Sequence, residues 1–340
     1  MHKRVVIKIV GLSLVASLFF IQAAESRVKS FVIKIATLAP EGSSWMKTFN
    51  TLNSEIMKTT ENQVRLRIYS GGILGDETDM LRKMQIGQIH SAALTSGGLS
   101  VLFKEINILQ IPFIFQNYRE VDYILTKMDS LFKKGLEENG YVLLGWSEVG
   151  FIYMMSKNPI YSVNDIKKMK VWTWEGSKMA KVIFDEAGVA AIPLSIPDVL
   201  VGLQTGLVDV VYAPPTGAIS LQWFTKIKYL TDVPLAYVVG GVVMRKDTFK
   251  KIHRPFQSTL MEKFQRHLDQ LKAVTRNENQ EAIKVMAKHG VKIISPSKNQ
   301  ISEFKSLWNK ARGRLGNKAF SKMAFDEMSS YLEDYRRGRK

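Results

Sequence analysis

The chain has 340 residues, of which 46% are hydrophobic and none is cysteine. This is enough for one large or two medium domains with a sizeable core, and the lack of cysteine excludes disulfides, thiolate catalysis and cysteine-ligated zinc. The formal charge of +17 would suit a nucleic-acid-binding protein, but the basic residues are spread over separate segments and no nucleic-acid motif accompanies them. We therefore expect a solvated basic surface and no nucleic-acid partner.

The first 24 residues are typical of a secretory signal peptide. Lys3, Arg4 and Lys8 make the start basic, residues 9–21 are apolar, and Ala23 and Ala24 are small enough for cleavage. We predict a mature chain that begins at residue 24 or 25, lies in the periplasm and carries a formal charge of +14, which is +17 less three basic residues. An uncleaved membrane anchor is the alternative, although the apolar run is short for a span.

The first half of the chain alternates apolar runs with stretches typical of helices. The runs predict strands at 31–36, 64–69, 91–95 and 141–146, and the intervening segments predict helices that include 44–59 and 118–139. The turn at 70–77 lacks the Gly-Lys-Ser/Thr ending of a phosphate loop, so we expect Asp76 or a neighbour to cap the next helix. Such alternation predicts a parallel sheet flanked by helices.

A second unit is predicted to start near residue 149. Its strands are expected at 150–156, at the short run that ends in Trp172 and Trp174, at the apolar run before Tyr212, and at 233–244. A helix is expected at 216–226. Pro255 and Gly290 delimit a polar amphipathic helix long enough to bridge two domains, and a strand at 291–294 and further helices follow.

Nothing in the sequence predicts an enzyme, a metal site or a cofactor. The five histidines, at positions 2, 90, 253, 267 and 289, are not paired at the spacing of metal ligands. No G-x-S-x-G nucleophile elbow is present. We expect no catalytic residue, and an unrecognised carboxylate pair is the open alternative; recovery of a candidate ligand unchanged would separate binding from catalysis.

Several short motifs occur in an order that resembles one family. They are the turn at 70–77 with Gly87-Gln88-Ile89-His90, the run Ile111-Pro112-Phe113-Ile114-Phe115, the segment 162–166, and the stretch 169–215 with its L-Q-T-G-L-V-D. Together they resemble the periplasmic solute-binding proteins of TRAP transporters, the DctP-like family, over residues 33–330. The resemblance implies an α/β fold of two lobes, each a sheet flanked by helices, joined by a long bridging helix and closing on a small ligand.

The same resemblance implies a domain division and a set of partners. Lobe I would comprise 25–149 and 240–277, and lobe II would comprise 150–239 and 278–340, with hinges near residues 150, 240 and 278. The expected function is capture of a small solute in the periplasm and its delivery to the TRAP membrane permease. An accessory periplasmic protein, and a monomer or weak dimer, are further expectations.

The residues expected to touch the ligand depart from the family pattern. The family's carboxylate-binding arginine matches Trp172, its asparagine matches Ala213, and a second arginine matches Ile152. A carboxylate in a dry cleft needs a charged partner, so we expect an apolar pocket and a hydrophobic or uncharged ligand. The candidate ligand-binding residues are Trp172, Ala213, Ile152, Tyr153, Trp174, Tyr212, Ile196, Leu38, Trp45, Thr95, Ser96 and Phe113.

Three alternatives remain open. In the first alternative, the protein binds an organic acid through a relocated cation, with Lys170 or Arg245 as the donor. In the second alternative, it is a periplasmic docking or sensing protein whose cleft binds nothing. In the third alternative, Trp172 and Trp174 only pack in the core and the pocket lies elsewhere.

Overall fold

A computed structural model describes residues 30–338. The predicted signal peptide lies outside the described residues. Within 30–338, no helix combines the length and the apolar character that a membrane span requires.

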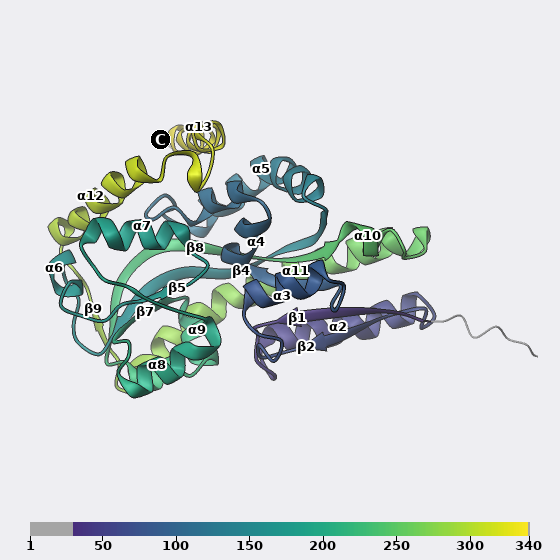
Figure 1. Ribbon diagram of the computed structural model, residues 1–340, viewed down its shortest axis with the longest axis horizontal. Helices are drawn as coiled ribbons and strands as arrows, with labels where there is room; N and C mark the ends of the chain where they lie inside the picture. The colour runs from purple at the N-terminus through teal and green to yellow at the C-terminus, as the bar shows by residue number, and fades with distance from the viewer. Residues whose placement is uncertain (1–29, 339–340) are drawn as a thin grey trace, which may run out of the picture.

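A seven-stranded mixed sheet runs through the molecule (Figure 1). The strand order is β2, β1, β3, β8, β4, β7, and β9 pairs with β8. The bounds are β1 (Phe31–Thr37), β2 (Val64–Tyr69), β3 (Ser91–Thr95), β4 (Tyr141–Ser156), β7 (Val210–Ala213), β8 (Tyr229–Arg245) and β9 (Lys292–Ile294). β1 is parallel to β2 and β3, as predicted. β4 runs in the same direction as these strands, but the sheet is mixed and not parallel throughout, because β8 returns between β3 and β4 and is antiparallel to both.

Two long strands join the two ends of this sheet. The strands predicted separately at 141–146 and 150–156 are one strand of 16 residues, β4. Its pairing with β8 has three register shifts, one of them between Glu148 and Gly150, and Gly150 has a φ of +116°, which glycine tolerates best. A bulge of this kind bends a strand without ending it. The long strand expected at 233–244 is confirmed and extends to 17 residues as β8.

Helices cover both faces of the sheet. The longer ones are α2 (Ser44–Thr59), α3 (Glu77–Gln85), α4 (Ser96–Leu102), α5 (Tyr118–Glu138), α7 (Lys178–Ala187), α8 (Val199–Thr205), α9 (Pro215–Ser220), α11 (Arg254–Lys288), α12 (Lys298–Leu315) and α13 (Lys322–Arg337). Short helices are α6 (Val163–Ile166) and α10 (Lys246–Phe249), with 3-10 turns at Lys104–Gln110, Ile196–Asp198, Trp223–Lys226 and Gly316–Lys318. The helix predicted at 216–226 is therefore split into α9 and a 3-10 turn.

The hydrophobic core divides between two lobes. The first lobe contains β1 to β3 with α2 to α5, and its core includes Phe49 and Phe132. The second lobe contains β7 and the two-stranded parallel sheet of β5 (Trp172–Trp174) and β6 (Ile192–Leu194), with α6 to α9 and α12 around them. The 35-residue helix α11 packs on α2, β4 and α9, so it bridges the lobes as expected.

The α/β fold with two lobes and a bridging helix is confirmed. The residue boundaries of the lobes remain a prediction. The last helix, α13, packs against α5 of the first lobe, although the predicted division assigns residues 278–340 to the second.

Candidate functional site

A cavity of about 650 Å³ lies where the lobes meet, a size typical of small-molecule sites. The loop after β1 supplies Leu38 and Trp45 to its wall, and the end of β3 supplies Thr95. From the second lobe, β5 and β7 supply aromatic rings. Ends of neighbouring strands meet at one edge of an α/β sheet, which explains why segments far apart in sequence share this space.

All but two of the predicted site residues line the cavity. Those that do are Leu38, Trp45, Thr95, Phe113, Ile152, Trp172, Trp174, Ile196, Tyr212 and Ala213. Tyr153 does not line it: successive side chains of a strand point to opposite faces, and its neighbours Ile152 and Met154 face the cavity. Ser96, the first residue of α4, is fully buried and does not line it either.

Trp172 both lines the cavity and packs in the core. Its side chain is only 3% exposed and its ring lies 4.8 Å from that of Tyr212 and 5.3 Å from that of Trp223, between centroids. The indole nitrogen donates to the Leu194 carbonyl oxygen at 3.1 Å. The ring therefore offers the cavity an apolar edge, while its one polar atom is already paired.

Trp174 connects the two lobes. Its indole nitrogen donates to Oδ2 of Asp76 at 2.7 Å, and Asp76 also accepts from the backbone of Ile196. The ring lies so close to Gly97 of α4 that a Cβ there would come within 2.7 Å of it. Asp76 caps α3 as the sequence predicted. Its contact with a residue 98 positions away was not predictable from the sequence.

Glu77, which the sequence analysis did not single out, lies beside Asp76 and lines the cavity. It is buried, and its carboxylate oxygens accept from Thr95 N (2.6 Å), Thr95 Oγ1 (2.9 Å) and Gly98 N (2.7 Å). Burial raises the pKa of Glu77 to about 8. At neutral pH the carboxyl therefore holds its proton and adds no negative charge to the wall.

Few charged groups line the cavity. Among the described lining residues there is no arginine, the one cation is Lys47 of α2, and the acids are Glu77, Glu278 and Glu281. Glu278 accepts a hydrogen bond from Ser44 across the lobes. Neither Lys170 nor Arg245 lines the cavity, so the alternative in which one of them supplies its cation is wrong.

Both of those cations are used elsewhere. Lys170 Nζ donates to the Gly206 carbonyl oxygen at 2.9 Å on the outside of the second lobe. Arg245 pairs with Asp247 at 2.6 Å near the far end of β8.

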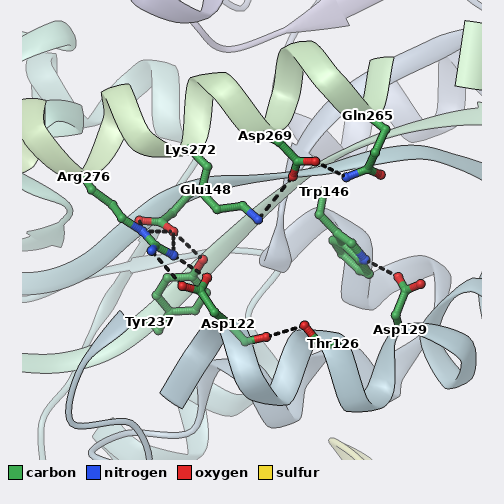
Figure 2. Close-up of polar contacts among 10 residues, drawn as sticks. All are labelled: Asp122, Thr126, Asp129, Trp146, Glu148, Tyr237, Gln265, Asp269, Lys272 and Arg276. Carbon is green, nitrogen blue, oxygen red and sulfur yellow. Dashed lines mark hydrogen bonds and ion pairs between the residues drawn. The ribbon is translucent and has the colours of Figure 1, made fainter. Parts of the chain in front are cut away.

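An ionic cluster around the buried carboxylate of Glu148 lies beside the cavity, where β4 passes between the lobes. Figure 2 shows Arg276 of α11 reaching the carboxylates of Glu148 and Asp122. Arg276 lies 2.8 Å from Glu148 and 2.6 Å from Asp122, and the Tyr237 hydroxyl donates to Glu148 at 3.2 Å. Because Glu148 is fully buried, this pairing is what compensates its charge.

One turn further along α11, Asn279 connects the same strand to the cavity wall. Its side-chain nitrogen donates to the Val149 carbonyl oxygen at 2.9 Å. Its oxygen accepts from the backbone nitrogen and hydroxyl of Thr216, at 3.0 and 2.8 Å, and Thr216 lines the cavity. The helix thus fixes the bulge of β4 and the start of α9 relative to each other.

The described residues hold no group of three or more histidine, aspartate or glutamate side chains that could bind a metal ion. The site therefore consists of aromatic and aliphatic surface, hydroxyl groups and a few carboxyl groups. Such a surface suits reversible binding of a small molecule.

Comparison with known proteins gives consistent matches. The profile of the DctP family, bacterial extracellular solute-binding protein family 7, matches residues 35–314. The 2,3-diketo-L-gulonate-binding periplasmic protein YiaO of Escherichia coli is 26% identical over 251 residues, which cover 73% of this chain and 75% of that protein.

Solved structures match at lower identity. The sugar acid binding protein DctPAm of Advenella mimigardefordensis, in complex with galactonate, has a TM-score of 0.84 at 18% identity, covering 90% of this chain and 99% of that one. A TRAP periplasmic solute-binding protein of Desulfovibrio salexigens, with bound orotic acid, has a TM-score of 0.82 at 18% identity, covering 91% and 99%. At these identities the two structures show a shared fold.

Proposed function

Because the chain belongs to family 7 of the bacterial extracellular solute-binding proteins, we propose that it binds a small solute between its lobes and delivers it to a TRAP membrane permease. The proposal includes export to the periplasm, for which the basic and apolar start of the chain and the periplasmic relatives are the support. Binding without catalysis is part of the proposal, since solute-binding proteins make up the family. An accessory protein, and a monomer or weak dimer, stay predictions.

The ligand we propose is apolar or weakly charged. What supports this is the composition of the cavity wall: Trp172, Ile152 and Ala213 line it, and no described lining residue is an arginine. An anion moved from water into such a cavity loses several kcal/mol of hydration. Arginine regains most of this through two parallel hydrogen bonds, and a ring edge or a methyl group does not.

An organic acid is the second candidate, and the comparisons favour it. The solved neighbours hold galactonate and orotic acid, and relatives are named for 2,3-diketo-L-gulonate and C4-dicarboxylates. For this chain the cation would be Lys47, which lines the cavity near Ser44 and Glu278. Its ammonium group, on an exposed part of α2, would meet a carboxylate at the entrance.

Two measurements separate these candidates. Organic extraction of the purified protein, followed by mass spectrometry, should release an apolar compound. Calorimetry with glucuronate, galactonate and orotate should show no tight binding. If one of these acids binds at micromolar affinity and Lys47→Met weakens it by about tenfold or more, the acid candidate replaces ours. Lys58→Met, on the exposed face of the same helix, is the matched control.

Ligand-driven closure is the proposed mode of action. A solute that touches both lobes stabilises the arrangement in which both can touch it. The bulge of β4 near Gly150 and the crossing of β8 near Gly240 are the proposed hinges. Small-angle scattering with and without the extracted compound should show a more compact protein when it is bound. An unchanged scattering curve, or no recoverable ligand, would favour a docking or sensing role.

A further inference from the structure

The cavity extends beyond the meeting point of the lobes, into a space between α7 and α12. These two helices pack side by side over the strands of the second lobe (Figure 1). Five residues on one side of α7 line the cavity: Met179, Ala180, Ile183, Phe184 and Ala187. Their spacing is that of one helical face. From α12, Phe304, Leu307 and Trp308 line the same cavity. We call this part of the cavity the α7–α12 arm.

The direction of the arm follows from the hydrophobic core clusters in which its residues pack. Met179 and Trp308 pack in a core cluster of the first lobe, whereas Ala187 and Phe304 pack in a cluster inside the second lobe. The arm thus leads from the interface of the lobes into the second lobe. The eight-residue step from Met179 to Ala187 corresponds to about 12 Å of helix.

The chemistry of the arm differs from that of the rest of the cavity. The helix faces that form it carry only apolar side chains, and the strands beneath add Met154, Val210 and Leu235. The charged lining residues Lys47, Glu77, Glu278 and Glu281 all belong to α2, α3 and α11. One cavity therefore has an apolar arm and a more polar end.

The arm is a space between the two helices that side chains leave unfilled. Ile183, Phe184 and Leu307 are half-buried rather than fully buried, although each lines the cavity. On the outside, Arg314 of α12 pairs with Glu186 of α7 at 2.6 Å. The two helices are thus linked at the surface, while apolar area remains open between them and available to a ligand.

We propose that the ligand is an amphiphile whose single alkyl chain occupies the α7–α12 arm and whose polar end lies where the lobes meet. This rests on the proposed function, since it names the class of solute that the protein captures. An alkyl chain matches an arm that follows several turns of helix and offers no hydrogen-bonding group along its helix faces. A compact sugar acid would leave this apolar surface uncovered.

Chain length is the variable that tests the proposal. Two probe series with the same alkyl tails, from hexyl to dodecyl, are titrated by calorimetry below their micelle concentrations or solubility limits: the fatty acids from heptanoate to tridecanoate, and the alkan-1-ols from hexanol to dodecanol. Each methylene buried in the arm should tighten binding about fourfold, until the arm is full and the affinity levels off. The two series differ at the polar end, a carboxylate against a hydroxyl, so their comparison also shows whether this end of the cavity prefers an acid.

A larger side chain inside the arm should reduce the length of the longest alkyl tail that fits there. Ile183→Trp and Leu307→Trp each add a ring inside the arm and should weaken dodecyl binding by about tenfold or more, with little change for hexyl probes. Lys181→Trp and Lys310→Trp place the same ring on the exposed sides of the same helices, so they should bind both lengths as the unmodified chain does.

The outcomes are distinguishable. If hexyl and dodecyl probes bind equally well to the unmodified chain, the arm is not the tail site and this inference is wrong, while solute binding itself stands. If sugar acids bind and neither alkyl series does, the inference and the apolar ligand of the proposed function both fail. The measurement on the unmodified chain decides between these outcomes even if a filled variant does not fold.

Discussion

The protein contains two neighbouring sites that treat charge in opposite ways. Where β4 passes between the lobes, Arg276 is held by Glu148 and Asp122. In the neighbouring cavity, the described wall has no arginine, and Trp172 lines it. At this point of β4, which we call the crossing, the chain itself supplies the partners of the buried Glu148 carboxylate. A buried cation in the cavity wall would depend on the ligand for its partner, and Lys47, the one cation among the described lining residues, is exposed. This contrast is the reason for our proposal that the ligand brings little charge.

The largest expected effect comes from removing the cation at the crossing. Arg276→Met leaves Glu148 buried without its main partner and should lower the free energy of unfolding by about 3–5 kcal/mol. Urea unfolding at neutral pH measures this. Because burial already raises the pKa of Glu148, and the loss of Arg276 raises it further, the effect should shrink at lower pH, where Glu148 takes up a proton.

Lys272→Met is the matched control for that experiment. Lys272 lies on the same helix and pairs at 3.4 Å with Asp269, whose side chain is exposed (Figure 2). Its loss should cost less than about 1 kcal/mol. Equal losses for the two variants would mean that Tyr237 and solvent suffice for Glu148, and the contrast between the crossing and the cavity would disappear.

A smaller effect is expected from the buried carboxylate next to the cavity. Trp174→Phe keeps most of the ring but removes the donor to Asp76, and we expect a loss of about 1–3 kcal/mol, as for other unsatisfied buried acceptors. Trp172→Phe removes a donor to the neutral Leu194 carbonyl oxygen and should cost about 1 kcal/mol. Thermal and urea unfolding of both variants give the comparison. Similar losses would show that Asp76 is compensated by its backbone donors alone.

A further effect, which appears as a dependence on pH, concerns Glu77. Its pKa is about 8 in the folded protein against 4.5 for an ordinary glutamate. Between these values the folded state keeps a proton that the unfolded state has lost, so the free energy of unfolding should fall as pH rises from 4.5 to 8, by up to about 1.4 kcal/mol per pH unit. Glu77→Gln cannot titrate, and urea unfolding across this range should show a shallower slope. Equal slopes would mean that Glu77 is ionised and that the cavity wall is more acidic than we infer.

The sequence predicted the elements better than their arrangement. Apolar runs located β1 and β3 to within a residue or two, because a largely buried strand leaves a nearly continuous apolar signal. β2 was located by its alternation, since Val64 and Leu66 are buried while Arg65 and Arg67 are exposed. The position of β8 between β3 and β4 was missed, since strand order depends on long-range pairing that local pattern does not record. The division of β4 into two strands was wrong because a bulge at Gly150 resembles a break in the sequence.

For the site, the ends of strands were predictable and side-chain directions were only partly so. Naming both Ile152 and Tyr153 ignored the alternation of a strand, which was available from the sequence. Lys47 and Glu77 were missed because helix starts after a loop gave no sign of facing a cavity. The contact of Trp174 with Asp76 joins two lobes, and no spacing in the chain encodes it.

The continuity of the sheet has a consequence for thermodynamics. β4 and β8 pair along most of their length and carry residues of the cores at both ends. Neither half has a complete sheet of its own, so melting one half would expose strand edges and core of the other. The molecule should therefore absorb heat in a single calorimetric transition, with the calorimetric and van't Hoff enthalpies in agreement. The two lobes can move relative to each other, but they unfold as one unit. A solute bound on either side of the cavity therefore raises the melting temperature of the whole chain.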